Sequence, residues 1–73
     1  MNSQIFIGEL ARGVTPDDLR DEFRSFGRIK ELSFKGRYAF IEYEERSQAE
    51  KAVDEMDNQK ILGSRIVVEF ASK

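Results

Sequence analysis

Residues 38–43 read Tyr-Ala-Phe-Ile-Glu-Tyr, and this stretch decides how the rest of the chain is interpreted. Successive side chains of a β-strand point to opposite faces, so the odd-numbered and even-numbered positions lie on different sides. The odd-numbered side, with alanine, isoleucine and tyrosine, has the composition of an ordinary core face. The other side carries the rings of Tyr38 and Phe40, and its role depends on whether the rest of the chain can cover it.

A second stretch, Ile-Phe-Ile at residues 5–7, has the same two-sided character. Its isoleucines share one face of a predicted strand, and Phe6 lies on the other. If the two strands pair side by side, Phe6 joins Tyr38 and Phe40 in one aromatic cluster.

Length and composition predict a single domain, which we place at residues 1–73. The chain has 40% hydrophobic and 36% charged residues, as folded globular domains do. The net charge of −2 and the isoelectric point near 5.1 argue against a bulk electrostatic binder of nucleic acid.

No apolar run approaches the ~20 residues that span a bilayer. We also expect no secretory leader and no association with a membrane.

The chain has neither cysteine nor histidine, and this limits the chemistry that the domain can perform. Disulfides, the usual zinc sites, thiol nucleophiles and imidazole bases are all excluded. Adjacent acids such as Asp17 and Asp18 are typical of helix starts, where carboxylates complement the helix dipole. We therefore predict a domain that is not an enzyme, with no catalytic residues, no metal and no cofactor.

Two helices are predicted from capping signals and apolar spacing. The first begins at Pro16 after the N-cap Thr15, and Gly27 ends it. The second follows a predicted capping box at residues 47–50, in which serine and glutamate serve each other's backbone amides. Small apolar residues then recur at helical spacing, which would let this helix pack close to a sheet.

The remaining segments predict two further strands, at residues 28–34 and 65–70. Residues 35–37 form a short basic turn between the second and third strands, and Gly63-Ser64 form a turn into the last strand. The order is strand, helix, strand, strand, helix, strand. This pattern is the α+β, ferredoxin-like split βαβ (βαββαβ) fold, a four-stranded antiparallel sheet with two helices on one face. Right-handed crossovers put both helices on the same side, which leaves the opposite face uncovered.

The uncovered face is predicted to carry four apolar side chains, and an exposed cluster of this kind usually marks a binding surface. The four are Phe6, Tyr38, Phe40 and Val67.

These residues resemble the RNA recognition motif. Ile5-Phe6-Ile7-Gly8-Glu9-Leu10 matches the hexamer motif of that family at all but one position, and Tyr38-Ala39-Phe40-Ile41-Glu42-Tyr43 fits the end of its octamer motif. The resemblance covers essentially the whole chain. More narrowly, the short second hairpin and the ending Gly-Ser-Arg-Ile-Val-Val-Glu-Phe-Ala are similar to the first such domain of serine/arginine-rich splicing factors, and paraspeckle proteins have a similar short turn.

The resemblance implies that the domain binds single-stranded RNA on its sheet. Phe6 and Phe40 match the family positions that stack two successive bases, and Tyr38 matches the one that packs against sugars between them. Stacking of a base on an aromatic ring contributes roughly 1–3 kcal/mol. The family also implies a role in pre-mRNA splicing or mRNA processing and a nuclear location.

The chain departs from the family pattern at three places. Glu9 stands where the hexamer usually has asparagine, which puts a carboxylate near the RNA face. Gly36-Arg37 reverse the usual order of basic residue and glycine. Ser33 replaces a frequent aromatic residue. We expect each departure to weaken RNA binding or to change its specificity.

Basic side chains near the aromatic cluster are predicted to contact phosphates. Lys35 and Arg37 flank the start of the central strand, and Arg65 and Arg12 lie in other candidate positions. Together with the aromatic residues, the predicted RNA-binding set is Phe6, Tyr38, Phe40, Lys35, Arg37, Ser33, Arg65 and Val67. Glu31, Glu42 and Glu69 share the face and oppose phosphate, unless they accept hydrogen bonds from base amino groups.

A second hypothesis is a protein-interaction module of the same fold, because fold does not fix function. The acidic helical face or the aromatic face would then hold a peptide. Under the leading hypothesis the partners are single-stranded RNA and other splicing or mRNA-processing proteins, and the isolated domain is expected to be monomeric.

Overall fold

The computed structural model describes residues 3–71. Its elements in chain order are β1 (Gln4–Gly8), α1 (Pro16–Phe23), the 3₁₀ turn η1 (Arg24–Phe26), β2 (Ile29–Phe34), β3 (Ala39–Tyr43), α2 (Arg46–Met56), β4 (Lys60–Ile61), β5 (Ser64–Arg65) and β6 (Val67–Phe70). None of the helices in this part of the chain has the length and apolar character needed to cross a membrane.

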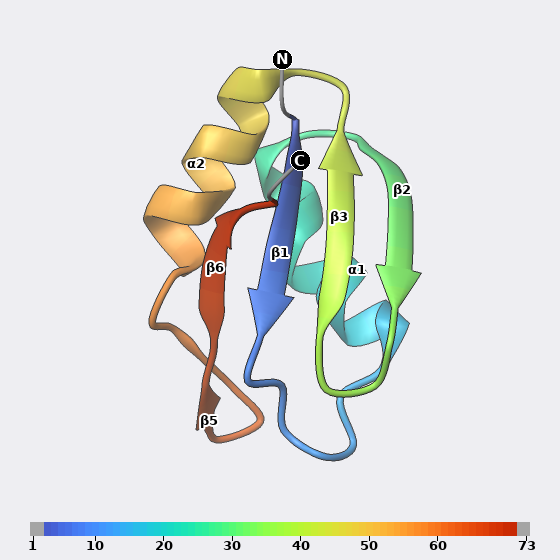
Figure 1. Ribbon diagram of the computed structural model, residues 1–73, viewed down its shortest axis with the longest axis vertical. Coiled ribbons are helices and arrows are strands. Elements are labelled where there is room, and N and C mark those ends of the chain that lie inside the picture. The colour runs from blue at the N-terminus through green and yellow to red at the C-terminus, as the bar shows by residue number, and fades with distance from the viewer. Residues whose placement is uncertain (1–2, 72–73) are drawn as a thin grey trace.

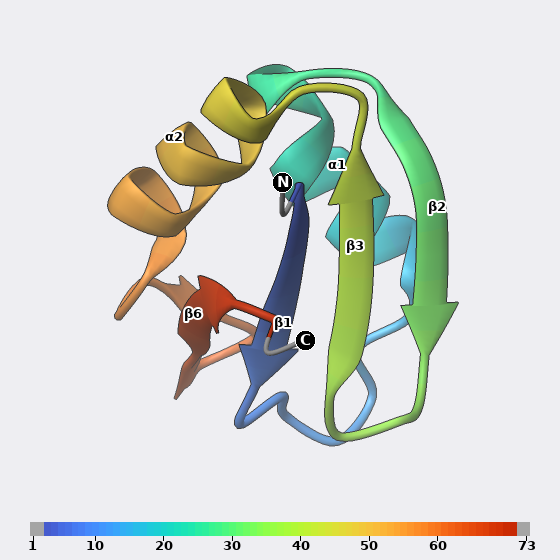
Figure 2. The same cartoon turned by 45° about the horizontal axis from the view of Figure 1, so that its top comes forward.

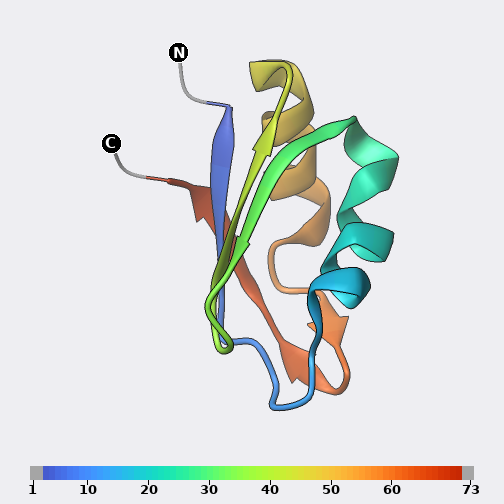
Figure 3. The ribbon, with the colours of Figure 1, turned by 90° about the vertical axis from the view of Figure 1, so that its right-hand side faces the viewer.

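The main sheet has four antiparallel strands in the order β2-β3-β1-β6 (Figure 1). Both helices lie on one side of it, and the turned views show no element over the other side among the described residues (Figures 2 and 3). The predicted split βαβ fold is therefore confirmed. In the register of the two central strands, Phe6 is opposite Phe40 and Ile5 is opposite Ile41.

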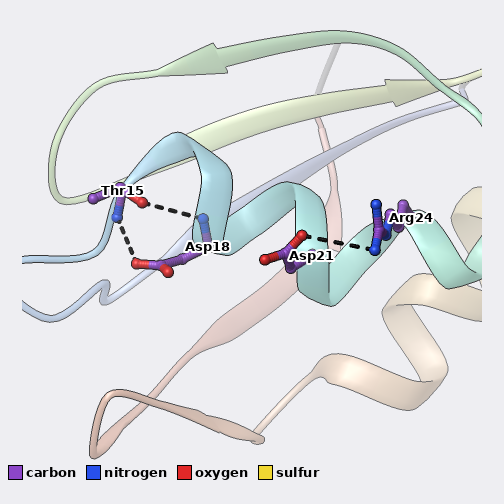
Figure 4. A network of polar contacts seen from close by, with 4 residues as sticks. All are labelled: Thr15, Asp18, Asp21 and Arg24. Atoms are coloured by element: carbon purple, nitrogen blue, oxygen red, sulfur yellow. Dashed lines mark hydrogen bonds and ion pairs between the residues drawn. The ribbon is translucent and has the colours of Figure 1, made fainter.

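Helix α1 begins as its sequence predicts. The Thr15 hydroxyl accepts a hydrogen bond from the Asp18 amide at 3.1 Å, and the Asp18 carboxylate accepts one from the Thr15 amide at 3.0 Å (Figure 4). This reciprocal pair satisfies two amides that a helix start leaves without partners. Farther along, Asp21 and Arg24 approach to 4.0 Å, but both are largely exposed, so the pair contributes little to stability.

Helix α2 begins two residues earlier than the predicted capping box implies, because its N-cap is Glu45 and not Ser47, and that prediction is wrong. The Glu45 amide donates to the side-chain carbonyl of Gln48 at 3.0 Å, so Ser47 is already inside the helix. Glu50, predicted to reach back to the serine, instead pairs with Arg46 at 3.2 Å. The helix starts where Gln48 can satisfy a free amide, and Ser47 has no such role.

The predicted last strand at residues 65–70 is interrupted, which corrects a second prediction. Arg65 belongs to a small separate ribbon, where β4 pairs with β5 across a two-residue turn of Leu62 and Gly63. Both turn residues have positive φ, 52° and 82°, as type I′ turns require. At Ile66 the amide donates to the Gln59 carbonyl and the carbonyl accepts from the Asn58 amide, so the chain pairs outside the main sheet before β6 begins.

The core lies between the sheet and the two helices. The largest side chains in the core that are fully buried from solvent are Tyr43, Phe23, Ile5, Ile7, Leu10, Leu19, Ile41, Ile66 and Val68. The Tyr43 hydroxyl donates to the Phe23 carbonyl at 2.7 Å, which satisfies a polar group that would otherwise be buried alone. Alanines 49 and 52 of α2 are also fully buried, as close packing of this helix against the sheet requires.

Candidate functional site

Three aromatic rings meet on the face of the sheet that the helices leave open, and we call Phe6, Tyr38 and Phe40 the aromatic cluster. The ring centroids of Phe6 and Phe40 are 5.6 Å apart, and Tyr38 lies 6.0 Å from each. The Tyr38 side chain is 44% exposed, and both phenylalanines are half-buried. The predicted cluster is thus formed, and solvent or a ligand can reach its rings.

Gly8 explains why the ring of Phe6 lies as it does. A Cβ atom added at Gly8 would be 2.8 Å from one atom of the Phe6 ring and 2.9 Å from another. The ring therefore leans over the glycine, in space that any side chain would occupy. The glycine of the hexamer motif is thus needed for the position of the aromatic ring two residues earlier.

Two hollows open on this face, one on each side of Phe6. The first hollow, of about 330 Å³, is lined by Phe6, Gly8, Glu9, Arg37, Tyr38 and Val67. The second hollow, of about 290 Å³, is lined by Phe6, Phe40, Glu69, Phe70 and Ala71. Each hollow combines aromatic rings with at least one charged side chain, which suits a flat ligand with polar edges.

The basic turn between β2 and β3 lies beside the first hollow. The Lys35 amide donates to the Tyr38 carbonyl at 2.9 Å, and Gly36 supplies the positive φ of 95° at the turn. Arg37 is joined to the loop after β1 by two hydrogen bonds with Leu10. Its Nε donates to the Leu10 carbonyl at 2.8 Å, and its carbonyl accepts from the Leu10 amide at 3.0 Å. The guanidinium is thus held at the edge of the aromatic cluster.

Glu9 lines the first hollow, and its backbone is in a left-handed conformation with φ of 61°. Its carbonyl accepts a hydrogen bond from the Ser64 hydroxyl at 3.1 Å, which ties the loop to the small ribbon. Its side chain is exposed. A left-handed conformation is uncommon for a residue other than glycine, asparagine or aspartate, so the loop holds Glu9 against its own preference.

The other predicted site residues divide into two groups. Ser33 is opposite Phe40 in the strand register, and Val67 lines the first hollow, so both border the aromatic cluster. Arg65 is directed elsewhere, since its Nη1 donates to the Asn58 carbonyl at 2.9 Å in the loop after α2. Neither Arg65 nor the exposed Arg12 lines either hollow.

Phe70 is on the core face, as the alternation of the last strand predicts, since it is opposite the buried Ile5 in the register and packs against the core. It is half-buried and also lines the second hollow, a contact that the sequence did not predict. The Arg46 guanidinium lies over its ring, 4.7 Å from the centroid. The available signal for its contact with the second hollow was its place at the end of β6.

The acidic residues on this face lie mostly at the other end of the sheet from the basic turn. Glu31 is directly opposite Glu42 in the register of β2 and β3, and Glu69 is opposite Phe6. Within residues 3–71 no group of three or more acidic side chains is placed to hold a metal ion. The open face combines the aromatic cluster with the guanidinium of Arg37, so it can hold a flat, partly anionic ligand by its faces and edges.

Comparison with known proteins gives one family. A model described as "RNA recognition motif" matches residues 5–67. The chain is 37% identical over 71 residues to serine-arginine protein 55 of Drosophila melanogaster, covering 97% of this chain and 19% of that protein. It is 31% identical over 68 residues to human serine/arginine-rich splicing factor 5, covering 93% of this chain and 25% of that protein. The chain thus spans a quarter or less of these two relatives.

Solved structures of the same fold include those of Pes4, Nab3 and NONO-1. The third such domain of Pes4 superimposes with a TM-score of 0.94 at 29% identity, covering 97% of this chain and 93% of that one. The Nab3 domain, solved in a study of how it recognises cis elements of non-polyadenylated RNAs, gives 0.90 at 26% identity, covering 100% and 99%. A homodimer of NONO-1 from C. elegans gives 0.91 at 31% identity, covering 96% of this chain and 29% of that one.

Proposed function

This chain belongs to the RNA recognition motif family, and from that membership we propose that it binds a short single-stranded RNA through the open face of its sheet. Two successive bases stack on Phe6 and Phe40, and Tyr38 packs against the sugar between them. Single-stranded RNA suits such a surface because its unpaired bases offer flat faces for stacking and free edges for hydrogen bonding.

The observation that carries this proposal is the half-exposed aromatic cluster with a hollow on each side of Phe6. Apolar rings left in contact with water usually mark a binding surface. The two hollows share one wall, so two neighbouring bases can occupy them while contacting the same ring.

The distribution of charge also supports RNA. Arg37 lines the first hollow, and Lys35 is exposed in the same basic turn, so a phosphate can reach both side chains. Much of the acid is elsewhere, on the exposed surfaces of α1 and α2, such as Asp17, Asp21 and Asp54. The net charge of −2 therefore describes the whole domain and not its open face.

The relatives extend the proposal to the protein that contains this domain. Because the human relative is named a serine/arginine-rich splicing factor, we propose a role in pre-mRNA splicing or mRNA processing, with a nuclear location and with other processing proteins as partners. We propose no catalytic activity and a monomeric isolated domain.

The decisive experiment is the Phe40→Ala substitution. Affinity for a pool of short degenerate single-stranded RNAs, measured by fluorescence anisotropy, is expected to fall by roughly 1–3 kcal/mol, or about 5- to 150-fold. Circular dichroism should show that the variant remains folded, because the Phe40 ring lies outside the core. A folded variant that binds RNA as tightly as the parent would contradict the proposal.

The second candidate is a protein-interaction module, favoured by the acid on α1, where four of the eight residues are aspartate or glutamate. In that case a basic peptide would bind to the helical side. RNA would then produce no chemical-shift change at Phe6, Tyr38 or Phe40 in an NMR titration, at either low or near-physiological salt. A partner that survives nuclease treatment but is lost when the acids of α1 are neutralised would favour this candidate.

A further inference from the structure

The two hollows differ in their polar walls. The first hollow has both a carboxylate, from Glu9, and a guanidinium, from Arg37, beside the rings of Phe6 and Tyr38. The second has the carboxylate of Glu69 and no cationic side chain in its lining. Only the first hollow therefore offers strong acceptors and strong donors to the edge of a flat ligand.

Of the two charged residues of the first hollow, Arg37 is held through both its side chain and its backbone, and Glu9 is held through its backbone. Arg37 is fixed to Leu10 by its two hydrogen bonds, and Glu9, the residue before, is fixed by the Ser64 hydroxyl at its carbonyl. The two do not neutralise each other, since the side-chain ion pairs within 4.0 Å in residues 3–71 are Asp21–Arg24 and Arg46–Glu50. A carboxylate and a guanidinium thus face one cavity, and each keeps capacity for a ligand.

Given the RNA-binding role proposed above, we propose that the first hollow is a guanine pocket in which Glu9 selects the base. A carboxylate has two oxygens and pairs best with two adjacent N–H donors. Guanine offers such a pair on one edge, its ring N1–H and its exocyclic N2–H₂. Adenine and cytosine offer one amino nitrogen, and uracil offers one imino group.

The acceptors of guanine match the other wall. Its O6 and N7 atoms are the preferred partners of an arginine side chain. With the base stacked on the aromatic cluster, Glu9 accepts from N1–H and N2–H₂, and Arg37 donates from its Nη atoms toward O6. The Nε of Arg37 remains bonded to Leu10, so the guanidinium keeps its place while it binds.

The backbone at Glu9 supports a functional reading of this side chain. At φ of 61° glycine or asparagine would be less strained than glutamate. Strained conformations of this type persist at binding sites more often than elsewhere. A glutamate at a backbone position that disfavours it, beside a hollow whose arginine has no ion pair among those described in residues 3–71, fits selection for its carboxylate.

The test uses the 73-residue chain and fluorescein-labelled hexamers that differ at one base. The host is all uridine, and its third base is replaced by guanine or by inosine, which is guanine without the 2-amino group. We expect the guanine RNA to bind about tenfold tighter than the inosine RNA, because a hydrogen bond to a charged group is lost. In the Glu9→Gln variant the ratio should fall below about twofold, since the amide has a single acceptor oxygen.

The matched control is Glu69→Gln, which removes the same charge from the second hollow on the same face. Both variants should bind the all-uridine host slightly more tightly, because each removes one negative charge near the phosphates. Only Glu9→Gln should lose the preference for guanine over inosine. Both side chains are exposed, so neither substitution is expected to unfold the domain.

The outcomes separate this inference from the RNA-binding proposal. If the chain binds the hexamers and Phe40→Ala weakens binding, but Glu9→Gln keeps the full preference for guanine over inosine, the guanine pocket is refuted and RNA binding stands. A parent chain that binds guanine, inosine and all-uridine RNA equally refutes the pocket in the same way. If no RNA binds and Phe40→Ala changes nothing, both proposals fall together.

Discussion

The two faces of the central strands share one backbone but differ in how far their side chains are exposed. On the helix side, Ile5, Ile7 and Ile41 have no exposed surface at all. On the open side, their strand neighbours Phe6 and Phe40 are only half-buried. The side chains on both faces are strongly apolar, so hydrophobicity does not explain the difference. The helices cover only one face, so we expect substitutions on the covered face to change stability and substitutions on the open face to change binding.

The largest expected effect comes from breaking the covered face. Ile41→Ala should lower the free energy of unfolding by about 2–5 kcal/mol, because it removes a fully buried side chain and leaves a cavity. A domain of this size is only marginally stable, so much of its stability would be lost. Urea denaturation of the parent, Ile41→Ala and Phe40→Ala measures the contrast. Equal losses of stability in the two variants would contradict it.

A smaller effect is expected at the hydroxyl of Tyr43, which is buried on the covered face and bonded to α1. Tyr43→Phe removes the donor that satisfies the Phe23 carbonyl and should lower the free energy of unfolding by about 1–2 kcal/mol. Tyr38→Phe is the matched control, since its side chain is 44% exposed on the open face. Thermal denaturation should show a clear loss for the first variant and little change for the second.

The same pair of tyrosines predicts a pH dependence. Burial raises the pKa of the Tyr43 hydroxyl above its usual value of about 10, because the charged phenolate would be desolvated. The unfolded chain then releases this proton at a lower pH than the folded domain does. This contribution to stability is complete below pH ~10 and is lost as the pH rises beyond it.

Stability measured at pH 8 to 12 should therefore decline less steeply in Tyr43→Phe than in the parent. Tyr38→Phe should follow the parent curve. An alkaline decline of the same slope in all three proteins would show that Tyr43 is not its source.

The smallest expected effect concerns like charges on the open face. Glu31 and Glu42 are directly opposite across β2 and β3, and such a pair is destabilising. Glu31→Lys should raise the free energy of unfolding by roughly 0.2–1 kcal/mol and should tighten RNA binding at low salt. Glu22→Lys on α1 is the control, because it changes the net charge equally on the helical side. If both variants tighten RNA binding equally, the location of the charge on the open face is unimportant.

Local sequence was sufficient to predict the order of the two helices and of the four strands of the main sheet, and also the aromatic cluster. The alternation at residues 38–43 assigned Ile41 to the core and Phe40 to the open face, and the register of β1 with β3 brought Phe6 beside them, as expected. The cap at Thr15 was also predictable, since a cap depends on residues within one turn. These features follow from side-chain periodicity and from short-range hydrogen bonds, both of which are visible in the sequence.

The two wrong predictions concern the residue at which α2 begins and the residue at which the last strand of the main sheet begins. Two overlapping sets of residues can start α2, and the bond between Glu45 and Gln48 decided for the earlier one. The last strand has unbroken alternation, yet Ile66 pairs with Asn58 and Gln59 outside the main sheet. A strand pattern gives the direction of side chains and not the partner of each backbone group, so the break was invisible.

Local sequence patterns predict the order of the helices and main strands, the apolar core face and the three rings on the opposite face. The surroundings of those rings depend on long-range contacts of the folded chain. The bond between Arg37 and Leu10 joins residues 27 positions apart, and the bond between Ser64 and Glu9 spans 55 positions. These contacts depend on how loops from distant parts of the chain meet at one end of the sheet. No local pattern encodes that meeting, and it places Glu9 and Arg37 on the walls of one hollow.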